Sequence, residues 1–367
     1  MRLVTRVKLN PTREEHAALT ATLLTCNKVA NELSSYAYET NMKRKYDLHY
    51  AQYNHHKSLL GSQALIRTIA KVADAYTTQK GLLQSGTLKG KRKEKALAKP
   101  IAFRNNSAQA FDKNNLSYNL DHQTVSIYSV QGRLKQVRFE CSSAQLEQLK
   151  TSRKGETDLV LENGTFYLIA GIEIQEAPLR EVTDYLGFDS GIVNIATTSD
   201  GHNWSGGAVT LRRKKNRALR AKLQTKGTKS AKRLLKKRSK KESRFVKDVN
   251  HCISKKIVRI AEHTGRGIAH ENLKGIRDRA RSSKPLRTEL NSWAFAQLFS
   301  FVAYKAKLAG IPVRIVEPAY SSQLCPDCGT VGRENRKTQA LFKCVSCGCS
   351  GNADVIAAHN IRTFALA

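Results

Sequence analysis

The sequence predicts an α+β protein of several domains: a small β-barrel with a helical insertion, then an α/β domain interrupted by a zinc site. Three patterns support this fold class. Apolar residues recur at helical spacing in residues 12–80, short alternating strands fill residues 100–174, and strands alternate with helices after residue 184. At 367 residues, the chain is long enough for two or three hydrophobic cores.

The N-terminal part begins with a strand and continues as helices. Residues 3–9 alternate as a strand does, and Thr12 and Glu15 have the spacing of a capping box at the start of a long helix. A second helix is expected over residues 57–80, with its apolar stripe in a core and any nucleic-acid contacts on the opposite face. Because strand 3–9 precedes both helices, we expect it to pair with later strands, which makes the helices an insertion.

Residues 100–174 predict the barrel, as a small antiparallel barrel or curved sheet. Turns are expected at residues 129–132 and 162–164. The expected strands are 101–103, 120–130, 137–139, 159–161 and 165–172.

The C-terminal half predicts alternating strands and helices, which is typical of an α/β domain. A hairpin is expected first, and it ends at Asp200 and Gly201. The expected strands are 185–188, 192–198, 267–270 and 313–316, and the expected helices are 290–308 and 355–364.

The charge balance indicates a nucleic-acid partner. Lys and Arg total 63 against 30 Asp and Glu, so the net charge is +33, a self-repulsion that a polyanion would neutralise. Between Arg212 and Lys247, eighteen basic residues accompany a single acid, Glu242, on a predicted basic helix or helix pair. The residues predicted to bind nucleic acid are Arg212, Arg213, Lys214, Lys215, Arg217, Arg220, Lys232, Arg233, Lys236, Lys237 and Arg238.

A membrane surface explains this charge less well. No apolar stretch approaches the roughly 18–20 residues that a bilayer span needs, and residues 1–6 lack the apolar core of a signal peptide. We therefore expect a cytoplasmic protein without a membrane partner, and we favour a monomer.

Four cysteines form the strongest local motif. Cys325 and Cys328 make one C-x2-C pair, fifteen residues follow, and Cys344 and Cys347 make the second pair. A glycine directly after each pair permits the tight turn that aims both sulfurs at one ion. Without a secretory signal, this spacing indicates a structural zinc site rather than disulfides, and Cys349 has no such pairing.

Three carboxylates stand at the ends of predicted elements. Asp189 and Glu271 each end a predicted strand, and Asp354 opens the last predicted helix. If the three converge, their mutual repulsion favours bound cations. Two magnesium or manganese ions suit an all-oxygen site and would support phosphodiester hydrolysis.

In order along the chain, the motifs after residue 184 resemble the TnpB family, which bacterial insertion sequences encode and which is similar in plan to type V CRISPR effectors. The resemblance implies an RNase H-like (RuvC) nuclease domain with catalytic Asp189, Glu271 and Asp354, and a zinc ribbon before the last acid. The matching segments are 187–196, 248–251, 254–258, 271–276, the four cysteines and 353–361.

The resemblance also implies a division into domains. A wedge-like barrel would comprise residues 1–10 and 98–182, with a helical recognition insertion at 11–97. The RuvC-like part would comprise 183–319 and 351–367, with the zinc ribbon at 320–350.

The implied partners are a guide RNA derived from the transposon end and double-stranded target DNA. Base pairing would then read the sequence while the protein reads a short flanking motif, with the basic segment holding RNA or the heteroduplex. The implied function is RNA-guided DNA cleavage in the bacterial cytoplasm, at the nucleoid when the protein is on DNA.

Three positions depart from the family pattern. Ile356 stands where the family usually has Asn, Ser190 stands where an apolar residue is commoner, and His270 stands where an aliphatic residue is usual. Three other functions compete: a guided DNA-binding protein with weak catalysis that assists transposition, a strand-joining transposase, and a simple zinc-ribbon RNA-binding protein. The acid order Asp, Glu, Asp disfavours the transposase, and the intact acids disfavour the binding proteins.

Overall fold

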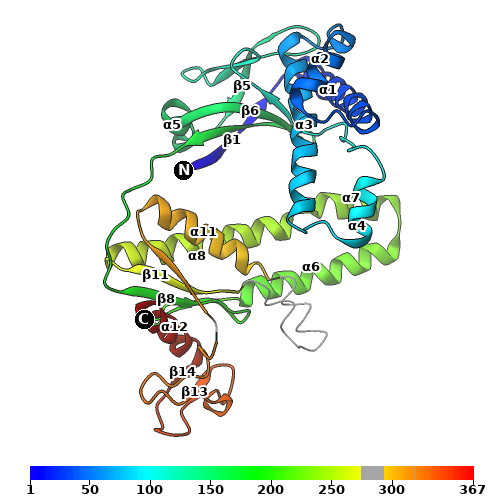
Figure 1. Cartoon of the computed structure of the whole chain (residues 1–367). Coiled ribbons are helices and arrows are strands. Elements are labelled where there is room, and N and C mark those ends of the chain that lie inside the picture. The colour runs from blue at the N-terminus through cyan, green and yellow to red at the C-terminus, as the bar shows by residue number, and fades with distance from the viewer. Residues whose placement is uncertain (274–292, 318) are drawn as a thin grey trace. The chain divides into compact units, whose positions relative to one another are not determined.

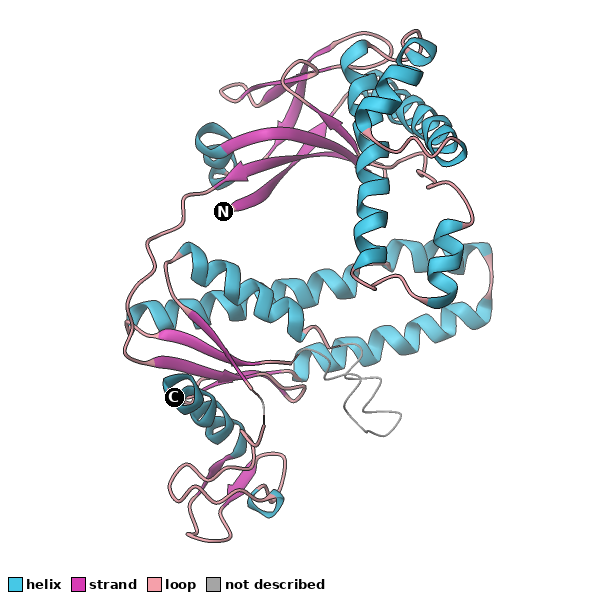
Figure 2. Ribbon diagram, viewed as in Figure 1, coloured by secondary structure: helices cyan, strands magenta, loops and turns pink. Residues whose placement is uncertain are grey.

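The computed structural model describes residues 1–273, 293–317 and 319–367, and its contacts divide the chain into two compact units (Figures 1 and 2). Unit 1 is Met1–Ile174 and unit 2 is Gln175–Ala367. Residues 274–276 of the matching motif and 290–292 of a predicted helix lie outside the described residues.

Unit 1 contains a seven-stranded antiparallel sheet in the order β2-β6-β7-β1-β5-β4-β3. The sheet nearly closes, because the Tyr118 hydroxyl of β3 lies 3.5 Å from the Thr157 hydroxyl of β6. A barrel-like sheet therefore exists, as predicted. The strands are β1 (Arg2–Asn10), β2 (Gln109–Phe111), β3 (Leu116–Asn119), β4 (Thr124–Ile127), β5 (Leu134–Glu140), β6 (Arg153–Glu162) and β7 (Thr165–Glu173).

Four helices of unit 1 are inserted between β1 and β2, and β1 pairs with β5 and β7, as expected for the first strand. The capping box at Thr12 and Glu15 is confirmed, since each residue's side chain bonds the other's backbone N–H. Leu33 and Val72 are fully buried in the core of these helices. The helices are α1 (Arg13–Glu39), α2 (Lys45–His56), α3 (Ser62–Gln84) and α4 (Gly90–Leu97).

Two strands predicted in unit 1 were wrong. Residues 101–103 form no strand, because the side chain of Asn31 bonds both the N–H and the C=O of Phe103, at 2.7 and 3.0 Å, in place of a neighbouring strand. Residues 120–130 are not one strand: β3 and β4 form a hairpin whose turn ends at Gln123, with φ +50°.

Two further corrections concern helices. The helix predicted from residue 57 begins at Ser62, and α2 ends before it at His56. Helix α5 (Ser143–Ser152) was not predicted, although Ser142 and Gln145 form a second capping box at its start. That spacing was the signal in the sequence that could have revealed it.

Unit 2 contains a five-stranded sheet in the order β10-β9-β8-β11-β12. Strands β8, β11 and β12 are parallel, whereas β9 and β10 run antiparallel to their neighbours. The strands are β8 (Tyr185–Asp189), β9 (Asn194–Thr198), β10 (Asn203–Ser205), β11 (Gly267–Glu271) and β12 (Val313–Val316).

Helices cover both faces of this sheet (Figure 2). Phe188 and Ile268 pack with α8 (Lys241–His263) and α11 (Phe295–Leu308) in one core. Ala269, from the next position of β11, packs with α12 (Ala353–Leu366) in another. Successive residues of a strand point to opposite faces of the sheet, so neighbouring residues of β11 belong to different cores. Strands that are buried on both faces in this way carry nearly continuous apolar sequences.

Gly187 allows α12 to approach β8 closely. A Cβ at this position would lie 2.1 Å from the carbonyl oxygen of Ala358 and 2.7 Å from the backbone nitrogen of Arg362. Arg362 also forms a two-pronged ion pair with Asp184, at 2.8 Å for each bond. The close packing and the ion pair together fix α12 against the sheet.

Gly187→Ala is therefore expected to destabilise unit 2 by about 3 kcal/mol or more, because backbone atoms of α12 have to move away. Chemical denaturation checks this value. Gly81→Ala is the control: a Cβ there meets nothing within 4 Å on α3, so stability should rise by about 0.5–1 kcal/mol. Equal effects of the two changes would contradict the packing argument.

The basic segment forms helices, but three rather than one or two (Figure 1). They are α6 (Gly207–Lys226), α7 (Lys229–Arg238) and the first part of α8. Gly227 and Lys240 interrupt the helical backbone, because their φ angles of +63° and +66° lie in the left-handed region. In the described residues, no helix is long and apolar enough to cross a membrane.

Candidate active site and zinc site

Asp189 and Glu271 end neighbouring parallel strands. In the register of β8 and β11, Phe188 is opposite His270, so the two acids that follow leave the sheet side by side. The carboxyl ends of parallel strands share one edge, which is where sites in such sheets usually lie. The structure therefore brings together two of the three predicted acids by strand pairing.

Asp354 joins them from α12. Asn352 caps this helix by accepting from the backbone N–H of Asp354 at 3.0 Å, and the Asp354 side chain is 6% exposed. Asn194, at the start of β9, donates to Oδ2 of Asp354 at 2.8 Å. The third acid is thus tied to the strand that follows Asp189 in the chain.

The electrostatics of Asp189 reflect the other two acids. Burial raises the pKa of Asp189 to about 7, and the negative charges of Glu271 and Asp354 add to the rise, while Arg336 lowers it. Burial also raises the pKa of Glu271, against a hydrogen bond from Ser321. Glu271 and Asp354 are therefore close enough to Asp189 to disfavour its ionised form.

Arg336, Asn194 and Ser321 were missed in the sequence. Arg336 donates to Oδ1 of Asp354 at 2.9 Å from within the zinc segment, and Ser321 donates to Oε1 of Glu271. No spacing rule distinguishes these residues, because their positions depend on how the zinc segment folds back onto the sheet.

Ser190 and His270, which depart from the family pattern separately, contact each other. Oγ of Ser190 lies 3.2 Å from Nε2 of His270, whose ring packs between Phe188 and Phe299 with centroids at 4.5 and 5.0 Å. Burial lowers the pKa of His270 to about 3, so the ring is neutral at pH 7. This contact therefore joins the residue after Asp189 to the residue before Glu271.

The four predicted zinc ligands converge. Sγ of Cys325 lies 3.6 Å from Sγ of Cys347, and Sγ of Cys328 lies 3.6 Å from Sγ of Cys344. Four Zn–S bonds of about 2.3 Å in a tetrahedron place sulfurs about 3.8 Å apart, so the cluster fits zinc. The four ligand atoms all lie within 4.8 Å of one another, as one shared ion requires.

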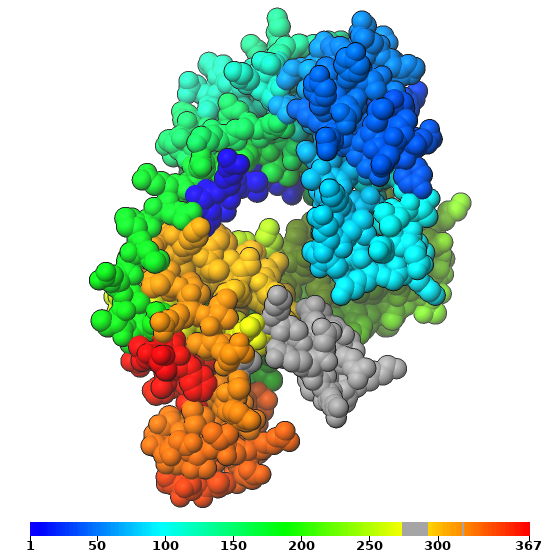
Figure 3. Space-filling view, in the orientation of Figure 1, coloured from blue at the N-terminus to red at the C-terminus, as the bar shows by residue number. Residues whose placement is uncertain are grey.

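Tight turns form the two halves of the zinc site. Gly329 and Gly348 have φ of +73° and +77°, and their N–H groups bond the carbonyls of Cys325 and Cys344 at 3.0 and 3.2 Å. Cys349 lies outside the group of four. Around the cluster, β13 (Leu341–Lys343) and β14 (Ser350–Asn352) pair, and the segment forms a lobe of unit 2 next to α12 (Figure 3).

Ile356 packs against this zinc segment. It is 9% exposed and belongs to the small core of Phe342, Cys325 and Cys344, so it joins α12 to the zinc lobe. Isoleucine at position 356 therefore contributes to the packing between the zinc lobe and α12.

Restoring the family residue by Ile356→Asn should lower the free energy of unfolding by about 1–3 kcal/mol, because an amide would replace an apolar side chain in this core. Urea unfolding measures the change. His359→Asn, at an exposed position of the same helix, should stay within about 0.5 kcal/mol. Unchanged stability of the Ile356 variant would exclude the packing role.

The predicted nucleic-acid residues mostly face solvent. Arg213 and Arg238 are only partly exposed: Arg213 lies 3.9 Å from Glu242, and Arg238 donates to Asn216 at 3.4 Å. These two arginines also tie α6 to its neighbours. The exposed ones are Arg212, Lys214, Lys215, Arg217, Arg220, Lys232, Arg233, Lys236 and Lys237.

The fold defines the class of protein. The chain superimposes on Cas12f1 in a cryo-EM structure of the Cas12f1-sgRNA-target DNA complex with TM-score 0.57 and 14% identity, over 99% of this chain and 98% of that one. CasPhi-2 (Cas12j) bound to crRNA gives TM-score 0.55 and 10% identity, over 100% and 98%. The chain therefore has the fold of the Cas12f and CasPhi effectors.

Sequence comparisons add particular relatives. Residues 295–361 match the family described as Cas12f1-like, TNB domain. TnpB-like protein MJ0751 of Methanocaldococcus jannaschii is 38% identical over 149 residues, 40% of this chain and 52% of the relative. Cas12f1 of Sulfoacidibacillus thermotolerans is 40% identical over 122 residues, 33% and 28% of the two chains.

A third relative matches more of this chain. The putative RNA-guided DNA endonuclease InsQ of Escherichia coli K12 is 28% identical over 221 residues, 54% of this chain and 53% of the relative. The chain thus spans about half or less of the length of these relatives. The predicted resemblance to the TnpB family is confirmed.

Proposed function

We propose that this chain is an RNA-guided, divalent-metal-dependent DNA endonuclease associated with a transposable element. One observation carries the proposal: two acids leave adjacent parallel strands side by side, and Asp354 of α12 is close enough that its charge acts on Asp189. Burial, together with the charges of Glu271 and Asp354, raises the pKa of Asp189 to about 7. Buried like charges of this kind are costly to a structure and are typical of functional sites. The names of the relatives agree with this activity.

Unit 2 would provide the RNase H-like (RuvC) nuclease domain, with the zinc ribbon inserted before its last helix. Its strand order, antiparallel over β10, β9 and β8 and parallel over β8, β11 and β12, supports this assignment. Unit 1 would provide the recognition insertion, residues 11–97, and most of the wedge-like barrel, residues 1–10 and 98–182, of which residues 175–182 fall in unit 2.

The acids suit hard divalent cations. Asp189, Glu271 and Asp354 offer only oxygen atoms, which magnesium and manganese prefer. Such ions, when bound, activate water and stabilise both oxygens of a phosphodiester displacement.

The neighbours of the acids would orient them. Ser321 donates to Oε1 of Glu271, and Asn194 and Arg336 donate to the two oxygens of Asp354. Arg336 also offsets part of the negative charge while cations are absent. These contacts limit the rotamers of the carboxylates before any ligand arrives, which favours a preorganised site.

The basic helices would bind RNA or the heteroduplex. The exposed arginines and lysines of α6 and α7 cover a surface with few acids, which suits a phosphate backbone. The proposed partners are a guide RNA from the transposon end and double-stranded DNA.

The test is cleavage by the full chain purified with RNA co-expressed from its own transposon end. Magnesium and a plasmid library with randomised bases beside the guide match are added. Guide-dependent double-strand breaks would establish the nuclease and the flanking motif. Guide-dependent binding by the wild-type chain without cleavage would instead establish the alternative, a guided DNA-binding protein that assists transposition.

A further inference from the structure

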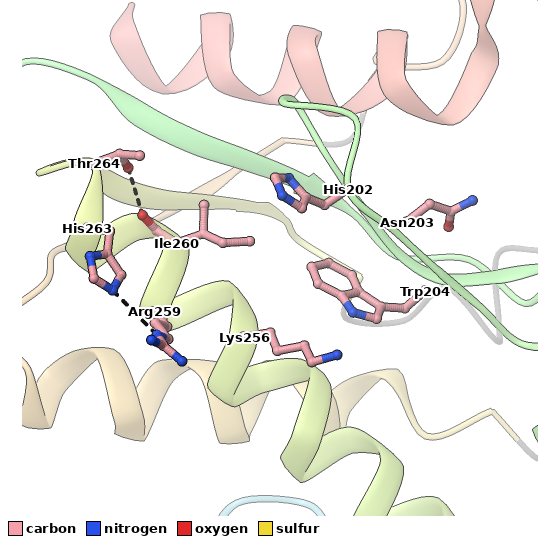
Figure 4. A pocket seen from close by; sticks show the side chains of 8 residues that line it. All are labelled: His202, Asn203, Trp204, Lys256, Arg259, Ile260, His263 and Thr264. Atoms are coloured by element: carbon pink, nitrogen blue, oxygen red, sulfur yellow. Dashed lines mark hydrogen bonds between the residues drawn. The ribbon is translucent and has the colours of Figure 1, made fainter.

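A pocket of about 550 Å³ lies between the edge strand β10 and the second half of α8 (Figure 4). Helix α8 ends at His263, shortly before β11 begins at Gly267. The acids, by contrast, stand where β8 and β11 end. The pocket therefore lies toward the opposite edge of the sheet from the proposed nuclease site and has no role in the mechanism above.

Aromatic rings line the strand side of the pocket. His202 precedes β10 and Trp204 lies within it, two positions on and so on the same face. Their rings are nearly parallel, at 17°, with centroids 6.4 Å apart. Trp204 is half-buried, which fixes its ring while a part of it remains accessible.

Cations line the helix side. Lys256 and Arg259 are exposed and three residues apart, so they share one face of α8. Arg259 lies 3.4 Å from a ring nitrogen of His263, and neither cation has an ion pair with a described residue. The lining contains no Asp or Glu, so its positive charge is not offset within the pocket.

We propose that this pocket binds one nucleotide of a single-stranded nucleic acid. The base stacks on Trp204, and the phosphate lies between Lys256 and Arg259. Aromatic rings beside uncompensated cations are the recurrent platform for single strands, because every base has a π-face and every nucleotide a negative charge. A nucleic-acid ligand is also what the proposed function requires, but binding in this pocket does not depend on DNA cleavage.

The rival reading is a pocket for a small acidic metabolite. The edge position of β10 argues against it, because the pocket lies beside an exposed edge strand and is open to solvent rather than enclosed around a small ligand. A single strand can come from RNA or from unwound DNA, and both present the same base and phosphate chemistry.

The chain offers a direct spectroscopic test, since it has two tryptophans. In a Trp293→Phe background, Trp204 is the one fluorescent indole. The full chain, freed of RNA in high salt, is titrated with hexamers of deoxythymidine and of uridine. We expect saturable quenching of Trp204, and the tighter hexamer identifies DNA or RNA as the source.

Variants then separate stacking from charge. Trp204→Leu should weaken hexamer binding roughly tenfold, and Trp204→Phe should restore most of the loss because a ring remains. Lys256→Gln with Arg259→Gln should lower the salt dependence by about one to two phosphates. Lys255→Gln, an exposed neighbour that does not line the pocket, should change affinity less than twofold.

Two results would overturn the proposal: hexamer binding that leaves Trp204 emission unchanged, or equal affinity of the Trp204→Leu variant and the parent chain in anisotropy. The same titration on Asp189→Asn should match the parent. Pocket binding can therefore fail while cleavage succeeds, and the reverse, so the two proposals are tested separately.

Discussion

Replacing Asp189 by Asn is expected to slow DNA cleavage about 10³-fold or more, because the amide keeps the size of the side chain and removes the charge that would hold a cation. Glu271→Gln should have a similar effect. The double variant should lose little more than either single one, since residues that act as a unit give non-additive losses. Single-turnover plasmid cleavage measures all three rates.

The Asp189 variant has a second expected property. In the absence of divalent cations it should unfold at a higher temperature than the parent, because one of three mutually repelling carboxylates is gone. Glu181→Gln removes an exposed acid of the same unit and should change neither property. Wild-type cleavage by Asp189→Asn would disprove the assignment of this acid.

The second large effect concerns the four cysteines. Cys325→Ser is expected to abolish stoichiometric zinc binding and to unfold the lobe around β13 and β14, because structural zinc contributes on the order of 10 kcal/mol to folding in small zinc domains. Metal analysis should give one zinc per parent chain. Limited proteolysis should cut the variant within the lobe.

Cys349→Ser is the matched control for zinc. Cys349 lies two residues after Cys347 but outside the group of four sulfurs, so this variant should keep its metal and its resistance to proteolysis. Loss of zinc from both variants would contradict the ligand set. Cleavage should fall with Cys325→Ser alone, because Arg336 and Ile356 join the lobe to Asp354 and α12.

The parts of the fold that were predictable depend on local spacing. The capping box of Thr12 and Glu15, the knuckles of the zinc site and the period of two in β7 involve residues a few positions apart. Residues 101–103 show where such reasoning fails. Their alternation is that of a strand, but Asn31, some seventy positions earlier, satisfies the backbone of Phe103.

The candidate site was likewise predictable only in the part that depends on secondary structure. Asp189 and Glu271 could be found because parallel strands end at a common edge, a rule that needs only the strand ends. Arg336 could not, because its approach to Asp354 depends on the irregular path of a loop within the zinc lobe. The neighbours that tune an acid are set by tertiary structure, whereas the acid itself follows from secondary structure.

The contact between Ser190 and His270 couples the effects of substitutions at two positions that are eighty residues apart. Replacing Ser190 alone by an aliphatic residue leaves Nε2 of the buried His270 ring without this partner, whereas replacing both residues removes the need for one. A path that removes the serine before the histidine therefore passes through a less stable variant. A chimaera made with a relative has to exchange the two strand ends together.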